Sequence, residues 1–503
     1  MFVNISHSEG LSPADEILFT SPFGYMFIDA SHSDKCLLPE SEFTVEGLKK
    51  LGKAMADEGT ESNEIEGNNS SIPAIFTYLG QFIDHDVTAR TDRDGSVSEL
   101  ANGVPPIPQH HDEILNNLKN GRRAQLDLDS VYGDGPGMAG SEMTAKAQAD
   151  CLYNTLDYTM KVLHTSDRLD LDRDPTTRRA NIADMRNDEN LIVSQLHASF
   201  IAFHNKVGGL QTGNDKEKYI RARQLVRWVY QYIVVNEYLN AVCDKNVVAD
   251  VLANGPRHHG ASAGRSGMFM PLEFSVAAFR FGHSMIRPFY KLNEIMTSRT
   301  IIKLLETGKH DDLFDADGNV SPAATIDWKN FAPAGSPQNA RKIDTLIAKG
   351  LFELPFEGRG EDPILANLAI SNLIRGYTLR IPTGQACAAT MRIIPLTPDE
   401  LRDGENATIR DILHEYYFDK RTPLWYYVLR ESAIQQKGEK LGEVGSRIIA
   451  ETLISFVKND PNSYLNNCCD EAVQQNGIDV KPGCGGVISS ISDMLSFAEV
   501  ASF

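Results

Sequence analysis

A helical spacing of apolar residues, which recurs along most of the chain, constrains the fold most. In residues 74–88 the apolar positions stand three or four apart, as expected for a helix with one buried face. The same spacing predicts helices at 188–207, 215–243, 272–286, 340–354, 363–379 and 442–458. Alternating patterns that would indicate β-strands are scarce. We therefore expect a mainly α fold with few short strands.

The chain divides by composition into two unequal parts. Residues 1–70 are polar and irregular, which indicates an N-terminal arm. Residues 71–503 carry the helical pattern without an internal repeat or a low-complexity tract. With 42% hydrophobic residues in 503, the chain can bury a large core. We predict an arm at 1–70 and a single large helical domain at 71–503.

Charge and composition exclude several classes of partner. The formal net charge of -19 repels nucleic acid and anionic membranes. No apolar run approaches the roughly 18 residues of a membrane span. The first residues lack a basic stretch followed by an apolar core, so we expect a cytoplasmic protein, with signal-independent secretion as the alternative. Seven cysteines without a CxxC pair indicate neither a zinc ribbon nor a thioredoxin-type site. The oligomeric state is not readable from the sequence.

The segment GQFIDHD places three titratable residues at the end of an apolar helix. A helix advances about 100° per residue, so Asp84, His85 and Asp86 point in different directions. Gln81 and His85, four residues apart, share one face. A core histidine with a hydrogen bond, beside two solvated aspartates, is one interpretation. A functional cluster is the other, because unpaired buried charge is costly.

Three further motifs have both a structural and a chemical interpretation. In LDLDSVYG, Asp127 and Asp129 would lie on one side of an extended chain, where they either bind Ca²⁺ or occupy a solvated turn. RNDEN (186–190) precedes an apolar helix and is compatible with an ordinary helix start. In FRFGH, His283 is either a buried core histidine or a metal ligand.

The remaining histidines carry no predicted chemistry. His204 lies within a predicted helix, where we expect a structural hydrogen bond. The pairs His110–His111 and His258–His259 lie in loops rich in glycine and proline. We expect both pairs at the surface.

Taken together and in order, these motifs resemble the animal-type haem peroxidases of the peroxidase–cyclooxygenase superfamily, which includes myeloperoxidase. The order is GQFIDHD, LDLDSVYG, RNDEN, FRFGH and then NLIRG at 372–376. The run NLIRGYTLRIPTGQ is most similar to bacterial members. The resemblance implies a haem buried between the central helices.

On the distal side of that haem, the resemblance implies three catalytic residues. His85 would take a proton from H₂O₂ and return it to the leaving oxygen, which requires a neutral imidazole. Arg186 would stabilise the negative charge that develops on the peroxide. Gln81 would hydrogen-bond a distal water or halide.

On the proximal side, the resemblance makes His283 the iron ligand. Asn372 would accept the ring N–H of His283 and so orient the ring. Arg280 and Arg375 would pair with the haem propionates, because the planar guanidinium suits carboxylates.

The resemblance also implies covalent links between the protein and the haem. Asp84 and Glu189 match the two carboxylates that form ester bonds to the haem. At position 190 this sequence has Asn, where myeloperoxidase has a methionine that forms a sulfonium link. We therefore predict two ester links and no sulfonium link.

The resemblance further implies a calcium site, built from Asp86, Asp127 and Asp129 with backbone oxygens of Arg123 and Gln125. The family has a threonine where this chain has Arg123. Only the carbonyl of Arg123 could bind Ca²⁺, and its guanidinium must then point away. The site is expected to bind Ca²⁺, with a weaker site, another ion or none as alternatives.

The implied activity is reduction of H₂O₂ and oxidation, through a ferryl intermediate, of a halide, a pseudohalide or a small aromatic donor. A fatty-acid dioxygenase of the same superfamily is an alternative, but it would need a tyrosine three residues before His283, where this chain has Arg280. A non-catalytic haem- or calcium-binding protein is a second alternative. A mononuclear metal hydrolase is a third, although the chain lacks an HExxH motif.

Overall fold

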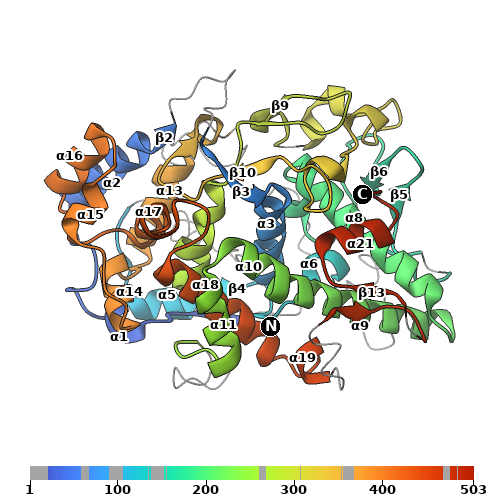
Figure 1. Cartoon of the computed structure of the whole chain (residues 1–503), viewed down its shortest axis with the longest axis horizontal. Coiled ribbons are helices and arrows are strands. Elements are labelled where there is room, and N and C mark those ends of the chain that lie inside the picture. The colour runs from blue at the N-terminus through green and yellow to red at the C-terminus, as the bar shows by residue number, and fades with distance from the viewer. Residues whose placement is uncertain are drawn as a thin grey trace.

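Helix α3 (Ile75–Val87) lies near the middle of the computed structural model (Figure 1). It contacts α8 (Leu191–Leu210), the short helix α6 (Asp129–Tyr132) and the two 3-10 helices η1 (Met185–Asp188) and η5 (Ala278–His283). The motifs of the sequence therefore meet around one central helix. The structure describes residues 21–57, 67–89, 106–133, 135–136, 152–154, 156–259, 268–305, 307–352, 354, 367–467, 476–483 and 485–503.

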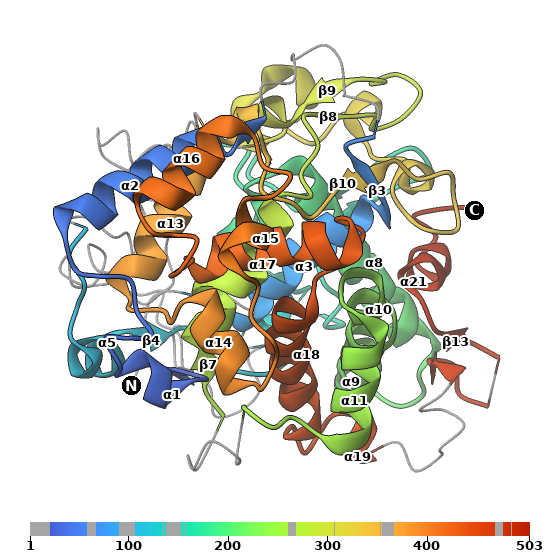
Figure 2. The ribbon, with the colours of Figure 1, turned by 60° about the vertical axis from the view of Figure 1, so that its left-hand side comes forward.

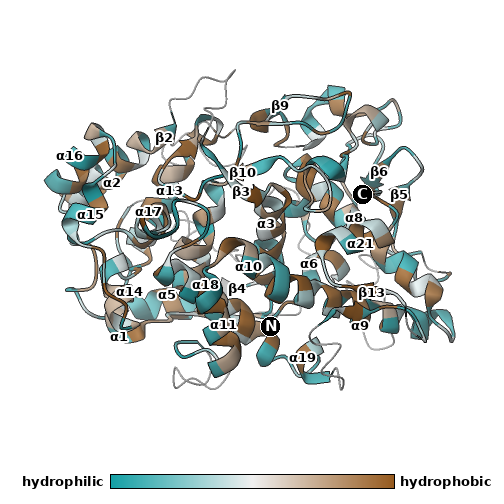
Figure 3. Ribbon diagram, viewed as in Figure 1, coloured by the Kyte–Doolittle hydropathy of each residue, from teal (hydrophilic) through white to brown (hydrophobic). Residues whose placement is uncertain are grey.

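Burial on nearly every side distinguishes α3 from the outer helices. Among its side chains only Gln81 and Asp84 are half-buried, and the rest are buried. Figure 3 accordingly shows much of α3 in brown, whereas outer helices such as α16 (Ala407–Glu415) change between brown and teal. No side chain caps the N-terminus of α3. Instead, the backbone N–H groups of Ala74 and Ile75 donate to the carbonyls of Gln338 (2.8 Å) and Phe331 (3.2 Å).

Longer helices surround α3. Helix α8 packs on α3 and on α9, while α17 packs on α18, α13 and η5. These helices bury the apolar faces that the sequence predicts. Their bounds are α9 (Asp215–Ile233), α10 (Leu239–Val242), α11 (Lys245–Asn254), α13 (Leu368–Thr378), α14 (Gly384–Thr390), α15 (Pro398–Arg402), α17 (Leu424–Gln436), α18 (Glu443–Lys458), α19 (Tyr464–Asn467) and α21 (Ile491–Phe497).

The strands in the described residues are short, and their sheets are small. One sheet has three strands, in the order β4 (Lys119–Asn120), β1 (Ser21–Gly24), β7 (Met270–Pro271). The two-stranded sheets pair β3 (Asn69–Pro73) with β10 (Asn339–Arg341), β2 (Ala56–Asp57) with β11 (Ile347–Ala348), β5 (Val162–His164) with β6 (Leu169–Leu171), β8 (Phe289–Tyr290) with β9 (Arg299–Thr300), and β12 (Ile478–Asp479) with β13 (Val487–Ile488). The predicted fold class, a mainly α single domain, is confirmed.

The described part of the predicted arm is ordered rather than irregular. Helix α2 (Glu42–Ala54) begins at Ser41, whose hydroxyl accepts from the backbone N–H of Thr44 (3.1 Å). It packs against α13 and α16, and Figure 2 shows the three helices together. At Gly52 an added Cβ would lie 2.8 Å from the backbone nitrogen of Ile370, so only glycine permits this approach. Residues 1–20 and 58–66 lie outside the described part, and the boundary at residue 70 stays a prediction.

The predicted helix at 340–354 is wrong. Its backbone N–H groups bind other segments: Arg341 donates to the carbonyl of Met285, Lys342 to Asn68 and Ile343 to Gly438. The segment forms β10, β11 and the 3-10 helix η11 (Lys349–Phe352) instead. The apolar residues of this segment are buried although the backbone is not an α-helix, so their spacing alone did not indicate the secondary structure.

The chain that leads to His283 changes helix type twice. A π-helix, η4 (Glu273–Ala277), passes into the 3-10 helix η5, which ends at His283. The buried carboxylate of Glu273 accepts from the backbone N–H groups of Met26 (2.8 Å) and Phe27 (3.0 Å). A second π-helix, η2 (Val234–Tyr238), joins α9 to α10. Such π segments are frequent at functional sites.

The remaining elements are short helices and 3-10 turns. Two of them are the α-helices α1 (Ile28–Ser31) and α5 (His111–Asn117). Within the described residues, no helix is both long and apolar enough to cross a membrane. The other 3-10 turns are η6 (Ile301–Lys303), η7 (Thr307–Lys309), η8 (Asp311–Leu313), η9 (Pro322–Ala324) and η10 (Trp328–Asn330).

Candidate active site

His85 lies one turn before the end of α3 and is held by a residue from a distant segment. Its Nδ1 lies 2.9 Å from Oδ1 of Asn187 on η1. With Nδ1–H as donor to that oxygen, Nε2 carries the lone pair and can accept a proton. Burial, followed by the charge of Arg186, lowers the pKa of His85 to about 4. The imidazole is therefore neutral at ordinary pH, as a general base requires.

Arg186 binds the end of the same helix. Its Nη2 donates to the carbonyl of His85 (2.8 Å) and its Nη1 to the carbonyl of Thr88 (2.7 Å). The last carbonyls of a helix have no partners within the helix, so Arg186 satisfies that of His85, together with the carbonyl of the C-cap residue Thr88. It also places a cation at the negative end of α3. Arg186 thus fixes the position of His85 as well as its charge environment.

Asp184 pairs with Arg186 and with a second arginine. Its carboxylate accepts from Nε and Nη2 of Arg186 at 2.6–3.2 Å and from Nη2 of Arg122 at 2.5 Å. Burial alone would raise the pKa of Asp184, but the charges of Arg186 and Arg122 hold it well below the usual range. We call Arg122, Asp184 and Arg186 the arginine cluster.

Gln81 and Asn190 connect α3 to the start of α8. Asn190 Nδ2 donates to Gln81 Oε1 (2.9 Å). Asn190 also caps α8, because its Oδ1 accepts from the backbone N–H of Val193 (2.9 Å). The helix-start interpretation of RNDEN is therefore correct for Asn190, and the same residue reaches the predicted distal side.

On the other side of the site, His283 pairs with Asn372 of α13. The Asn372 side-chain nitrogen, Nδ2, lies 2.8 Å from His283 Nδ1. A half-turn of the amide exchanges its nitrogen and oxygen. Iron binding through Nε2 requires the turned form, in which His283 Nδ1–H donates to Oδ1. The structure brings together this predicted pair, which lies 89 residues apart in the chain.

Two arginines and a tryptophan flank the proximal histidine. Arg280 Nε donates to the carbonyl of Ser275 (3.0 Å), and the carbonyl of Arg280 accepts from the indole N–H of Trp425 (3.1 Å). The Trp425 ring meets the His283 ring edge-on, with 6.5 Å between centroids. Arg375 lies half-buried on α13, one turn after Asn372. The position of Trp425 was not predicted, because no spacing in the sequence connects α17 to FRFGH.

The residues around His85 and His283 fit a haem. Each histidine has its Nδ1 beside an asparagine amide, and Nε2 is the ring nitrogen that the expected iron and peroxide chemistry would use. Oδ1 of Asp84, the residue before His85, is buried without a hydrogen-bond partner, which is costly unless a further group is bound there. Glu189 is half-buried at the end of η1. Asp84 and Glu189 are the carboxylates expected to meet the haem.

The predicted calcium ligands converge on the other side of α3. Both carboxylate oxygens of Asp86 and of Asp127 are buried without a hydrogen bond of ordinary geometry. Burial and the charge of Asp129 raise the pKa of Asp86 to about 7 and that of Asp127 well above its usual range. Among the described residues, no group of three His, Cys, Asp or Glu side chains has the arrangement of a metal site. The two orphaned carboxylates still fit a cation.

The Arg123 guanidinium lies beside the carboxylates: its Nη1 lies 3.5 Å from Asp127 Oδ2 and its Nε 3.9 Å from Asp129 Oδ2. The opposite charges attract. That the guanidinium points away when Ca²⁺ is bound stays a prediction. Arg223 also approaches Asp129, at 3.9 Å. We call Asp86, Asp127 and Asp129 the carboxylate cluster. Gln125 is half-buried in the same loop.

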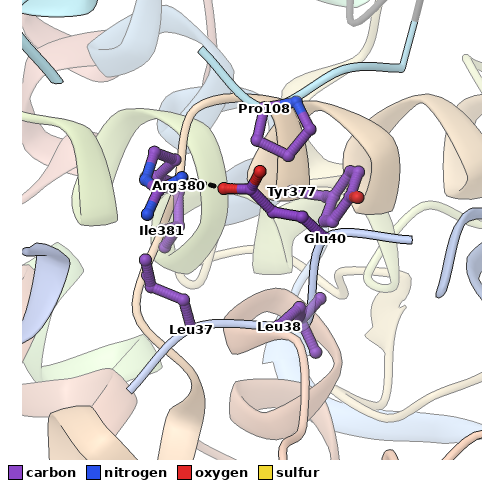
Figure 4. Close-up of a pocket in the computed structure, with 7 residues that line it drawn as sticks. All are labelled: Leu37, Leu38, Glu40, Pro108, Tyr377, Arg380 and Ile381. Atoms are coloured by element: carbon purple, nitrogen blue, oxygen red, sulfur yellow. Dashed lines mark hydrogen bonds and ion pairs between the residues drawn. The ribbon is translucent and has the colours of Figure 1, made fainter. Parts of the chain in front are cut away.

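A shallow pocket of about 210 Å³ opens on the proximal side, between residues 37–40 and the end of α13 (Figure 4). The ion pair between Arg380 and Glu40 spans it. A neighbouring cavity of about 280 Å³ shares Tyr377 and continues to Asn372 and Trp425. Asn372 and Trp425, which lie beside His283, therefore line a small hollow next to this pocket.

The histidines outside the site correct one prediction and confirm another. His111 and His259 were expected at the surface, but both are buried. His111 stacks on His32 with 4.0 Å between centroids, and His259 Nε2 lies 2.9 Å from the carbonyl of Phe269. Packing of the loops against the helical body buries one histidine of each pair, whereas His110 is exposed and His258 is half-buried. His204 has the expected structural bond, with Nδ1 3.0 Å from the Tyr132 hydroxyl.

Asp184 and Asn187 are the functional residues that the sequence did not reveal. Both belong to the segment around RNDEN, but no spacing indicated that Asn187 would face His85, 102 residues earlier. The signal was weak: an amide directly after a predicted catalytic arginine.

Comparison with known proteins agrees with this geometry. The model of the family "Animal haem peroxidase" matches residues 111–460. Heme peroxidase 2 of Caenorhabditis elegans is 24% identical over 352 residues, which cover 61% of this chain and 47% of that protein. Peroxidase mlt-7 of the same organism is 24% identical over 241 residues, 42% of this chain and 33% of that protein. The chain thus spans half or less of these relatives.

Solved structures share the fold at low sequence identity. Peroxidase A of Dictyostelium discoideum superposes with a TM-score of 0.61 at 15% identity, covering 96% of this chain and 94% of that chain. The fatty acid alpha-dioxygenase of Oryza sativa gives 0.58 at 14% identity, covering 98% and 87%. The family match over most of the chain, the shared fold and the paired histidines lead to one conclusion: this chain belongs to the animal haem peroxidase family.

Proposed function

We propose that this chain is a haem-dependent peroxidase that reduces H₂O₂ and oxidises a halide, a pseudohalide or a small aromatic donor. The observation that carries the proposal is the pair of histidines, each held through Nδ1 by an asparagine, on elements that contact each other. One histidine is buried and neutral, as a proton acceptor must be, and the other ends the helix η5. A bound haem would supply the redox chemistry.

Side chains of the protein transfer the peroxide proton and stabilise the charges that develop. His85 Nε2 takes a proton from the peroxide and returns it to the leaving oxygen, while the hydrogen bond from Nδ1–H to Asn187 supports the positive charge on the ring. Arg186 contributes a buried cation beside this exchange. His283 would bind the haem iron, and Asn372 would orient the His283 ring. Arg280 and Arg375 would pair with the haem propionates.

We further propose that Asp84 and Glu189 form ester links to the haem. The support is the buried, unpartnered Oδ1 of Asp84, since an ester would remove its charge from an apolar setting. Acid–organic extraction is expected to leave the haem on the protein after exposure to peroxide. Clean release of free haem from that sample would exclude the links.

We also propose that Ca²⁺ binds the carboxylate cluster, with the carbonyls of Arg123 and Gln125. The support is the four orphaned oxygens of Asp86 and Asp127, because oxygen ligands are what Ca²⁺ prefers. Binding would require the Arg123 guanidinium to withdraw from its contact with Asp127. Elemental analysis of protein dialysed against Ca²⁺ is expected to give about one ion per chain.

A fatty-acid dioxygenase is the second candidate, because its fold is shared. Against it stands Arg280, three residues before His283, with Phe279 and Phe281 beside it, since none of these can form a phenoxyl radical. Rapid O₂ uptake on addition of a fatty acid without peroxide, measured with an oxygen electrode, would favour the dioxygenase.

Absorption spectra of the haem-loaded protein test the peroxidase function directly. H₂O₂ is expected to change the Soret band within the mixing time of a stopped-flow instrument, and a halide or phenol to restore it. The His85→Ala variant should bind haem but respond more slowly, by about 10²-fold or more. An unchanged Soret band in the wild type would indicate a non-catalytic haem- or calcium-binding protein.

A further inference from the structure

The orientation of one amide in the candidate site follows from a helix cap. Asn190 caps α8, and its Oδ1 is committed to the backbone N–H of Val193, at 2.9 Å. The end of the Asn190 amide that remains is Nδ2, which can donate but not accept. The helix start therefore fixes which end of this side chain faces α3.

The Gln81 side chain therefore accepts this hydrogen bond through its amide oxygen. Asn190 Nδ2 lies 2.9 Å from the Gln81 amide, so the atom that it contacts is the acceptor, Oε1. Nε2 is then turned away from Asn190. Gln81 is half-buried and lies one turn before His85 on the same helix face. Two N–H donors are thus offered beside His85.

We propose that Asn190 is a positioning residue, which holds Gln81 with its N–H groups outward so that the distal site takes a small anion such as thiocyanate or bromide. The proposal rests on the proposed haem function, because the anion would lie on the His85 side of the haem. An amide N–H₂ group attracts an anion, whereas the carbonyl end would repel it and favour a donor such as a phenol hydroxyl.

Two substitutions separate the cap from the amide donor. In Asn190→Ser the hydroxyl can still cap α8, but nothing donates to Gln81. In Asn190→Asp the carboxylate also caps, and its second oxygen would accept from Gln81 Nε2 and so turn the amide. The matched control is Asn406→Ser, which changes the same kind of cap on α16, where Asn406 Oδ1 accepts from Ile409 N–H at 2.9 Å.

The readout is equilibrium binding of thiocyanate and bromide to the ferric, haem-loaded protein, titrated by absorbance without peroxide. Asn190→Ser is expected to raise the Kd about 3- to 10-fold, the range of one neutral hydrogen bond, and Asn190→Asp to raise it further. Asn406→Ser should leave it unchanged. In a Gln81→Ala background, Asn190→Ser should have no additional effect.

Three results would overturn the proposal. One is the absence of anion binding to the wild type. Another is an unchanged Kd in Asn190→Ser. The third is an equal loss in Asn190→Ser with and without Gln81, which would assign the effect to the cap alone. Failure of the proposed peroxidase function would be separate, because it would appear as an unchanged Soret band on adding H₂O₂ to the wild type.

Discussion

Two clusters of buried charge flank α3, and they differ in how completely they are satisfied. In the arginine cluster, Asp184 accepts several hydrogen bonds from Arg122 and Arg186, whose remaining contacts include the last carbonyls of α3. In the carboxylate cluster, Asp86 and Asp127 are as deeply buried, yet their oxygens lack hydrogen bonds. The first cluster needs nothing from outside the chain, and the second needs a cation or a proton.

This difference separates structural from ligand-binding charge. Burying a carboxylate is expensive, and the cost is offset only when a partner of opposite charge is held in good geometry. Asp184 has two such partners, so we assign it to the framework that positions His85. The cations near the carboxylate cluster are held less closely: Arg123 lies 3.5 Å from Asp127, and Arg223 lies 3.9 Å from Asp129. Arg122 and Arg227 act on Asp86 and Asp127 through their charge. Breaking the arginine cluster should therefore lower the stability of the chain itself, whereas the stability that the carboxylate cluster contributes should depend on added Ca²⁺.

The largest effect is expected from Asp184→Asn. The change keeps a side-chain oxygen that can cap η1, but it leaves Arg122 and Arg186 as unpaired buried cations. Removing one partner of a buried ion pair costs about 3–5 kcal/mol, so the free energy of unfolding should fall by that amount in a denaturant titration. Asp174→Asn, at an exposed capping aspartate, is the control and should cause no comparable loss. Equal stability of Asp184→Asn and wild type would refute the arginine cluster as framework.

Removal of Ca²⁺ should give the next largest effect, and it acts only on the carboxylate cluster. At a Ca²⁺ concentration of about 100 Kd, binding stabilises the folded state by about 2.7 kcal/mol, which a chelator should abolish. In the Asp127→Asn variant, the chelator should change the free energy of unfolding only slightly. In Arg123→Thr the effect of Ca²⁺ should increase, since a competing cation is removed from Asp127. A wild-type stability that is indifferent to chelator would instead assign the neutralising charge to Arg123 itself.

Substitutions of Asn187 test whether its hydrogen bond to His85 affects the rate of the reaction with H₂O₂. Loss of its hydrogen bond in Asn187→Leu should let the His85 ring rotate and change tautomer. Partners of this kind affect activity about 10- to 100-fold, so the rate of the Soret change with H₂O₂ should fall by that factor. Asn187→Asp, which still accepts from Nδ1–H, should retain most of the rate. Equal rates in Asn187→Leu and wild type would mean that packing alone orients the ring.

The sequence predicted those parts of the fold and the site that depend on local geometry. Helical spacing located α3, α8 and α18, and the 100° step correctly sent Asp84, His85 and Asp86 toward different surroundings. The same spacing did not reveal α2, because its sequence is largely polar although one face of the helix is buried.

Hydrogen-bond partners from distant segments could not be predicted from local spacing. The bond between His85 and Asn187 joins residues 102 positions apart, and only the folded chain reveals it. The contact between Arg123 and Asp127 was not predicted, because the sequence cannot show which charges remain unpaired until the helices have packed. The family resemblance supplied the pair of His283 and Asn372, which no local pattern contains.

The smallest effect is expected from mild acid, and it depends on the arginine cluster. His85 must be neutral to accept a proton, and burial with the charge of Arg186 lowers its pKa to about 4. At pH 5 such an imidazole is about 90% neutral, whereas one with the ordinary pKa of 6.5 is about 3% neutral. The rate of the reaction with H₂O₂, followed at the Soret band, should therefore fall by only about 10% between pH 7 and pH 5 and drop steeply below pH 4. A half-maximal rate near pH 6.5 would show that neither burial nor the charge of Arg186 lowers the pKa of His85. The arginine cluster would then position His85 without influence on its protonation.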